Sequence, residues 1–406
     1  MTKSDTLTRS LTEVDANFQA RPGILAGQLA TDVEFPVFAE HSKGSYVFDI
    51  EGNRYLDFIL GFGSVILGHS NESVDNAVIR AIRRGINPTL HTTDQIQLTK
   101  LLCSSIPNAD MVAILRTGSD ATTAAVRIAR AHTGRQHIIR WGYNGWHDWC
   151  APRETGIPQA TRKLTSTFEY GNLSSLEAVF LEHRHEIAAV IMMPLEVDVP
   201  SASYLADIAS LTRKNGALLI FDEIRTGFRL ALGGAQEFFG VQADLATFSK
   251  AMANGYCISC VTGPKHIMQC IENISMSSLF FRSRDGIAAS IATIESLRDG
   301  NSLTKIWSLG NKFMTGLSAA AQATGVPARA AGLPPMPYIE FDLKDNSAAK
   351  QVFADAMIRR GILIHPNHHW FICEEMGGND IDIAVQNAKL AFEDVKHFLS
   401  KNASES

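Results

Sequence analysis

Apolar residues along this chain gather in short runs that end abruptly in polar or charged residues. Runs of this kind, bounded by polar segments, are typical of strands buried on both faces. Between them lie segments with apolar residues at helical spacing, such as 121–133 and 205–214. The alternation predicts a mostly parallel sheet covered by helices. The predicted strands are 112–115, 138–141, 189–192, 217–221, 245–248 and 258–261.

Other patterns lie near the two ends of the chain. Residues 44–58 alternate large apolar and polar positions around Glu51-Gly52-Asn53, which predicts two antiparallel strands joined by a turn. A long helix is expected from about residue 285, with strands at 338–341 and 362–365, and residues 1–21 are expected to form a helix or an arm. The predicted domains are an N-terminal arm and hairpin at 1–70, which joins the small domain, a large domain at 71–290, and a C-terminal small domain at 291–406.

Two of the predicted strands end in side chains that make a specific chemical pair. The run 217–221 is followed by Asp222 and Glu223, and the run 245–248 is followed by Ser249 and Lys250. Open α/β sheets bind ligands beside the carboxyl ends of their strands. A lysine there can form a Schiff base, and an aspartate can keep a pyridinium nitrogen protonated. The alternative is structural, since such an aspartate is often a cap and a single lysine is usually a solvated charge.

The segment Arg-Thr-Gly-Ser-Asp-Ala at 116–121 lies between a predicted strand and a predicted helix. Gly118 permits a close backbone approach, Ser119 adds a hydroxyl, and the N-terminus of a helix presents free N–H groups. These features suit a phosphate group, with Thr117 as a further candidate. An ordinary helix cap is the alternative, because Ser and Asp are common capping residues.

The block from 221 to 255 reads FDEIRTGFR, then the apolar run that ends in Ser-Lys, then Asn-Gly. It resembles the class III (ω-type) pyridoxal-phosphate aminotransferases, and within them the glutamate-1-semialdehyde aminomutase-like branch. The resemblance extends from about Pro22 to Phe392. It implies the aspartate-aminotransferase type of α/β fold (fold type I), with a large domain built on a mostly parallel seven-stranded sheet and a smaller α+β domain.

The resemblance also implies roles for individual residues. Lys250 would hold pyridoxal 5'-phosphate as a Schiff base, and Asp222 would stabilise the pyridinium nitrogen. Tyr143 and Ile224 would pack on opposite faces of the ring, and the loop at 117–119 would hold the phosphate. A homodimer with the cofactor site at the subunit interface is implied, because a loop of the partner normally completes the site in this family.

Three positions depart from the family's pattern. Asn144 stands where the family usually has a His after Tyr143, so hydrogen bonding is kept but a titratable group is lost. Met193 stands where a Glu usually precedes Pro194. Leu279 stands where relatives have the Thr that reaches the phosphate of the partner's cofactor.

A leucine cannot donate a hydrogen bond, so the region of Leu279 needs another donor. Ser278, Arg282 and Arg284 are the candidates, and the two arginines are alternatively candidates for an anionic substrate. Arg225 is a further substrate candidate, because an arginine can hold a carboxylate or phosphate through two parallel hydrogen bonds. A surface ion pair with Glu223 is the alternative.

Composition narrows the classes of function. The 406-residue chain has a net charge of -5, which gives no basic footprint for nucleic acid or an anionic membrane. No apolar run approaches the roughly 18 residues of a membrane span, and residues 1–23 lack the apolar core of a signal peptide, so a cytoplasmic protein is expected. No metal is expected, because Cys257 and Cys260 lack a second pair and the histidines at 365, 368 and 369 lack a completing ligand set.

The predicted function is that of a pyridoxal-phosphate-dependent aminotransferase. It would move an amino group between an amine or amino acid donor and a carbonyl acceptor through a Schiff base at Lys250. The alternative is an intramolecular aminomutase, although residues 25–38 contain no Arg to hold the carboxylate of glutamate-1-semialdehyde. A third hypothesis is a homologue that binds the cofactor without turnover, and the intact pair of Lys250 and Asp222 argues against it.

Overall fold

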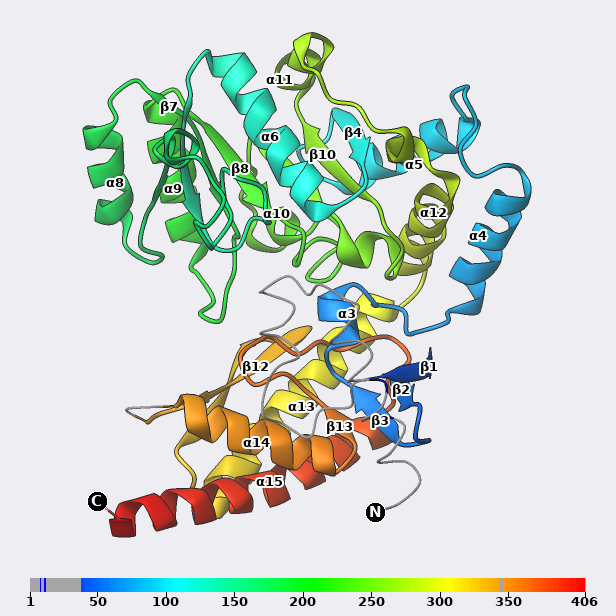
Figure 1. Ribbon diagram of the computed structural model, residues 1–406, viewed down its shortest axis with the longest axis vertical. Helices are drawn as coiled ribbons and strands as arrows, with labels where there is room; N and C mark the ends of the chain where they lie inside the picture. Colours follow the sequence, from blue (N-terminus) through cyan, green and yellow to red (C-terminus); the bar gives the residue numbers. More distant parts are fainter. Residues whose placement is uncertain (1–7, 9–10, 12–37, 344–345, 406) are drawn as a thin grey trace. The chain divides into compact units, whose positions relative to one another are not determined.

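The computed structural model describes Thr8, Leu11 and residues 38–343 and 346–405. The chain divides into two compact units, each with its own sheets and helices (Figure 1). One unit comprises residues 1–62, 67–71 and 304–406, and the other comprises 63–66 and 72–303. The expected N-terminal helix or arm and the segment 25–38 lie almost wholly outside the described residues.

The second unit is built on a seven-stranded sheet with the order β4-β10-β9-β8-β7-β5-β6 (Figure 1). β10 is antiparallel to both of its neighbours, and the other strands all run in one direction. This architecture confirms the predicted fold class, and every strand predicted for the sheet is present. The strands are β4 (Met111–Leu115), β5 (His137–Trp141), β6 (Thr165–Thr167), β7 (Ile187–Met192), β8 (Leu218–Asp222), β9 (Leu245–Phe248) and β10 (Ser259–Gly263).

Successive residues of the central strands face two separate hydrophobic cores. In β8, Ile220 packs in the core that contains α6 (Gly118–Thr133). Its neighbour Leu219 packs in the core that contains α8 (Leu173–Glu182) and α9 (Ala202–Lys214). Because helices cover both faces, the central strands are apolar at nearly every position, as the sequence pattern predicted.

The start of α6 is fixed by its own first residues. The hydroxyl of Thr117 accepts a hydrogen bond from the backbone N–H of Asp120, and the Asp120 carboxylate accepts one from the Thr117 N–H. This reciprocal pair satisfies two of the N–H groups that the first turn leaves without a helical partner.

Other helices of this unit are α4 (Glu72–Arg83), α5 (Thr93–Ser105), α7 (Gln159–Arg162), α10 (Ala235–Phe239), α11 (Lys265–Met268) and α12 (Arg284–Asp299), with 3-10 turns η1 (Lys250–Ala253), η2 (Gln269–Asn273) and η3 (Leu279–Arg282).

The first unit contains the predicted hairpin. Asp49 accepts hydrogen bonds from the backbone N–H groups of Glu51 and Asn53, and Gly52 takes a left-handed φ of 83° that a glycine adopts without strain. The predicted strand at 362–365 is shorter than expected, because its pairing ends at Leu363.

The strands of the first unit are β1 (Ala39–Lys43), β2 (Tyr46–Asp49), β3 (Arg54–Asp57), β11 (Ala328–Leu333), β12 (Met336–Phe341) and β13 (Ile362–Leu363). Its helices are α14 (Ser347–Arg359), α15 (Gly378–Glu405), most of α13 (Ser302–Thr324) and the start of α3 (Leu60–Gly63).

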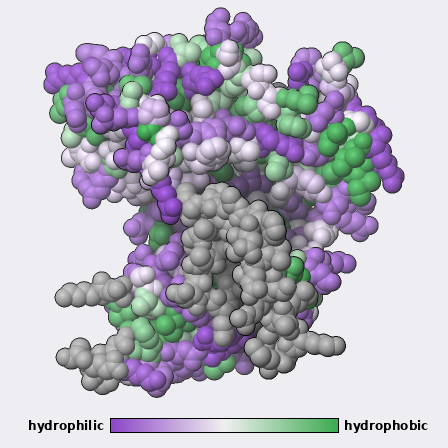
Figure 2. Space-filling model, in the orientation of Figure 1, coloured by the Kyte–Doolittle hydropathy of each residue, from purple (hydrophilic) through white to green (hydrophobic). Residues whose placement is uncertain are grey.

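The helices in the described part of the chain include none with both the length and the apolar character of a membrane span. Much of the face seen in Figure 2 is polar, with apolar residues in separate patches.

Candidate active site

The parallel strands bring several polar segments to one edge of the sheet. β8 and β9 are neighbours, and Asp222 at the end of β8 lies opposite Thr247 in β9. Lys250 follows β9 by two residues, so the carboxylate and the amine occur at adjacent strand ends, as predicted. The loop 117–119 follows β4 and the segment 143–145 follows β5 at the same edge. This is where open α/β sheets bind ligands.

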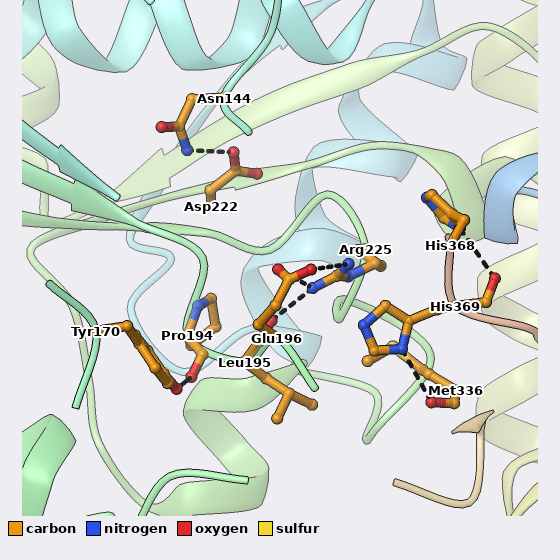
Figure 3. Close-up of polar contacts among 10 residues, drawn as sticks. All are labelled: Asn144, Tyr170, Pro194, Leu195, Glu196, Asp222, Arg225, Met336, His368 and His369. Atoms are coloured by element: carbon orange, nitrogen blue, oxygen red, sulfur yellow. Dashed lines mark hydrogen bonds and ion pairs between the residues drawn. The ribbon is translucent and has the colours of Figure 1, made fainter. Parts of the chain in front are cut away.

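Asp222 is a buried carboxylate held by specific donors. The side-chain amide Nδ2 of Asn144 donates to its Oδ2 at 2.9 Å (Figure 3). The backbone N–H of Ile224 donates to its Oδ1 at 3.2 Å. Burial raises the pKa of Asp222, while these hydrogen bonds and the positive charges of Lys250 and Arg225 act in the opposite direction. The carboxylate is therefore oriented before any ligand arrives.

Lys250 has an unusual backbone and an unusual amine. Its φ of 49° lies in the left-handed region, which costs a side-chain-bearing residue about 1–2 kcal/mol. Burial lowers the pKa of the Lys250 amine to about 8, and the nearby positive charge of Arg225 adds to this effect while Asp222 opposes it. Near neutral pH a larger share of this amine is neutral and nucleophilic than for an ordinary lysine.

The loop at 117–119 makes close contacts with other segments of the site. A Cβ atom on Gly118 would lie 2.9 Å from Cδ1 of Ile224, so a larger residue there would require the Ile224 side chain to shift. Gly145, with a φ of 113°, leaves room for Ser119, because a Cβ atom on it would lie 2.6 Å from the Ser119 hydroxyl. That hydroxyl has no hydrogen-bond partner among the described residues, whereas the Thr117 hydroxyl is occupied in the helix cap. Ser119 is thus better placed than Thr117 to donate to a phosphate.

Tyr143 lies in the loop after β5, and its side chain is 56% exposed. Partial burial raises the pKa of Tyr143, and the nearness of Cys150 and Asp222 contributes. An aromatic face in the neighbourhood of Asp222 can stack on a flat ring. Gly145 was not identified as a site residue from the sequence. A glycine two residues after Tyr143 could have indicated that another segment approaches the backbone closely there.

Arg225 does not pair with Glu223. Its Nη2 donates to Oε2 of Glu196 at 2.9 Å and to the backbone oxygen of Leu195, and the side chain is only 11% exposed (Figure 3). The suggested ion pair with Glu223 is wrong because Glu223 is buried elsewhere, where it accepts from Thr226 and from backbone N–H groups at the start of α10. Burial raises the pKa of Glu223 to about 7.

The segment around Leu279 contacts the region between α4 and α5. Ser278 caps η3 by accepting from the N–H of Phe280 at 3.3 Å. Arg282 lies 3.5 Å from a ring nitrogen of His91, and Arg284 forms an ion pair with Asp94 at 3.6 Å. The ion pair with Asp94 partly neutralises the charge of Arg284. The roles of Ser278, Arg282 and Arg284 toward cofactor or substrate stay predictions.

The histidines near 368 bond to backbone oxygens. Nδ1 of His368 lies 2.9 Å from the His369 oxygen, and Nδ1 of His369 lies 3.2 Å from the Met336 oxygen (Figure 3). Within the described residues, one group of three possible metal ligands occurs, formed by His137, His183 and Glu186.

This group of three lies at the other edge of the sheet from Lys250, since His137 begins β5. The rings of His137 and His183 stack at 3.8 Å with 23° between their planes, and Nε2 of His137 lies 2.9 Å from the Ser166 hydroxyl.

The site contains three groups suited to an enzyme that uses a carbonyl cofactor with a protonated ring nitrogen. They are the amine of Lys250 with its lowered pKa, the oriented carboxylate of Asp222, and the Ser119 hydroxyl at the N-terminus of a helix. The chain belongs to the class-III aminotransferases, because residues 29–374 match the model of that family. It is a pyridoxal-phosphate-dependent aminotransferase that acts on small molecules, as the sequence predicted.

Known relatives match nearly the whole chain. It is 38% identical to the 3-aminobutyryl-CoA aminotransferase of Cloacimonas acidaminovorans, over 97% of this chain and 99% of the relative. It is 31% identical to the glutamate-1-semialdehyde 2,1-aminomutase of Syntrophobacter fumaroxidans, over 89% and 91% of the two chains. Among solved structures, the FumI protein of Sphingopyxis sp. MTA144 matches with a TM-score of 0.93 and 26% identity, over 97% and 98% of the two chains.

The lowered pKa of Lys250 gives a direct prediction for the enzyme freed of cofactor. About half of the amine should be neutral at pH 8, with the neutral form dominant at higher pH and lost as the pH falls through about 8. The rate at which an amine-reactive reagent labels Lys250, followed by peptide mass spectrometry across pH 6–11, should have its midpoint near 8. Replacing Arg225→Gln removes a nearby positive charge and should move the midpoint upward.

A midpoint near the ordinary lysine value of about 10.4 would show that the amine is not perturbed.

Proposed function

We propose that this enzyme takes the amino group from a 3-amino acyl donor with the chemistry of 3-aminobutyryl-CoA, and that Lys250 and Asp222 are its catalytic residues. The observation that carries the choice of donor is the similarity to the Cloacimonas aminotransferase, which extends over 97% of this chain. The lack of Arg in 25–38 also disfavours glutamate-1-semialdehyde.

Bound pyridoxal phosphate would supply an electrophilic carbonyl and an electron-accepting ring. In the proposed roles, Asp222 would accept a hydrogen bond from the protonated ring nitrogen, and Nζ of Lys250 would be the covalent attachment point for the cofactor. With a donor bound, Nζ of Lys250 would be the base that takes the proton from the carbon that carries the amino group, and the acid that returns it. An amine with a pKa of about 8 is suited to both directions of transfer near neutral pH.

The loop at 117–119 is the proposed phosphate site. Ser119 has a hydroxyl without a partner among the described residues, and it stands in the first turn of the 16-residue helix α6. A helix N-terminus of this length stabilises an anion through its free N–H groups and its dipole. Tyr143 and Ile224 are proposed to enclose the ring, since Ile224 already contacts Gly118 of the phosphate loop.

The ion pair of Arg225 with Glu196 bears on the substrate. The guanidinium is largely buried, and its charge is already neutralised at 2.9 Å by the Glu196 carboxylate. A free amino acid would bring a carboxylate that competes with Glu196, whereas an acyl thioester brings no charge at that position. We therefore propose that the closed pair favours a donor whose acyl group is esterified, and that Arg225 lies on the substrate side.

The proposed reaction requires both a donor and an acceptor. With 3-aminobutyryl-CoA and a 2-oxo acid, the purified enzyme should form 3-oxobutyryl-CoA and the matching amino acid, measured by chromatography and mass spectrometry. Lys250→Ala should lower the rate by more than about 10³-fold, because it removes both the covalent anchor and the base. Lys305→Ala, an exposed lysine on α13, is the matched control and should leave the rate unchanged.

Turnover of a single substrate without an acceptor would contradict this proposal. Conversion of glutamate-1-semialdehyde alone would favour the aminomutase, which the 31% identity to the Syntrophobacter enzyme keeps as the second candidate. Binding of the cofactor with no turnover of any donor would favour the third hypothesis, a homologue that binds the cofactor without catalysis.

We also propose that the enzyme works as a cytoplasmic homodimer. Large apolar side chains are exposed along one part of the second unit: Ile79, Ile82, Ile86, Leu90 and Ile96 from the region of α4 and α5, and Leu279 and Phe280 at 70% and 53% exposure from η3. The two groups lie close together, because the N–H of Arg284 bonds to the Ile86 oxygen. An apolar surface of this kind is typical of a protein interface.

Replacing Leu279→Asp places a charge on this surface and should weaken the dimer. Light scattering after size-exclusion chromatography should give the dimer mass for the wild-type protein and a concentration-dependent shift toward the monomer for the variant. Leu390→Asp, at an exposed leucine of α15, should remain dimeric. A monomeric wild-type protein with full activity would contradict the proposal.

A further inference from the structure

Asn144 is held in place by hydrogen bonds to its backbone oxygen and from its side chain. It is 1% exposed, and its backbone oxygen accepts hydrogen bonds from the hydroxyl of Thr122 in α6 at 2.6 Å and from the thiol of Cys150 at 3.5 Å. Its side chain then reaches Oδ2 of Asp222 at 2.9 Å. The position of this amide is therefore set by the fold and does not depend on a ligand.

The hydrogen bond to Asp222 has only one possible direction. A carboxylate accepts and never donates in its ionised form, so the NH2 end of the amide must face Oδ2. The other oxygen, Oδ1, accepts from the N–H of Ile224 and lies 3.5 Å from the Thr247 hydroxyl. In the part of the chain that the structure describes, Asn144 is the one donor to Oδ2.

We propose that Asn144 is the positioning residue for Asp222, and that it orients this carboxylate toward the cofactor's ring nitrogen with a donor that does not titrate. This inference rests on the proposed role of Asp222. An imidazole at the same place would change its charge near pH 6.5, whereas an amide presents the same N–H at every pH in the working range.

The remaining charges around Asp222 come from other elements. Lys250 begins η1, Arg225 and Glu223 follow β8, and Tyr143 and Cys150 lie in the segment after β5. Each of these groups is the same in the wild-type protein and in a variant at position 144. A ratio of the two pH profiles therefore isolates the group at that position.

The test measures binding of pyridoxine 5'-phosphate, which has the ring and the phosphate but no aldehyde for Lys250. Titration calorimetry or fluorescence on the full-length protein freed of cofactor gives Kd from pH 5.5 to 7.5. Asn144→Leu keeps the size but removes the donor, and Kd should rise about tenfold because a buried carboxylate loses a hydrogen bond. Asn144→His restores a donor, and its Kd should return to within about threefold of the wild-type value at pH 7.5.

The pH dependence separates positioning from mere packing. The ratio of the Asn144→His Kd to the wild-type Kd should change across pH 5.5–7.5 as the introduced imidazole titrates. Thr123→Val is the matched control, because Thr123 bonds to His147 and Trp149 nearby without touching Asp222. Its Kd should stay at the wild-type value.

Two results would overturn the inference: wild-type affinity in Asn144→Leu, or a ratio for Asn144→His that is independent of pH. If Asn144→Leu does not fold, as judged by circular dichroism, the pH profile of Asn144→His decides the question. Failure of the wild-type protein to bind either pyridoxine phosphate or pyridoxal phosphate would instead contradict the proposed function itself.

Discussion

The site depends on one constraint, the parallel pairing of β8 with β9. Parallel neighbours end at the same edge of a sheet, so the residues that follow them are brought together however far apart they are in sequence. This pairing sets Asp222 opposite Thr247 and places Lys250 two residues beyond the end of β9. The apolar side chains of both strands, such as Ile220 and Leu245, are fully buried and hold the register.

Around that pairing, the electrostatics of the site follow from burial. Removing a carboxylate and an amine from water disfavours the charged form of each, which raises the pKa of Asp222 and lowers that of Lys250. The donors from Asn144 and Ile224 keep the carboxylate oriented, and Glu196 neutralises Arg225 close by. The protein thus prepares the proton-handling groups before the cofactor or substrate is present.

Much of the fold was predictable because the second unit has helices on both faces of its sheet. The central strands there are apolar at nearly every position, and polar residues such as Asp222 and Lys250 follow closely at their carboxyl ends. The edge strand β6 escaped prediction because Thr165-Ser166-Thr167 contains no apolar run. The partner of Arg225 was not predictable either, since Glu196 comes from a loop 29 residues away in sequence and local spacing favoured Glu223.

The most direct test of the account is to locate the cofactor. The purified enzyme, saturated with pyridoxal phosphate, is reduced with borohydride, digested and mapped by mass spectrometry. The account predicts one modified peptide, with the pyridoxyl group on Lys250, and no modification of that peptide when the same treatment follows Lys250→Ala. A pyridoxyl group on a different lysine, or none on a protein that binds the cofactor, would contradict the assignment of Lys250.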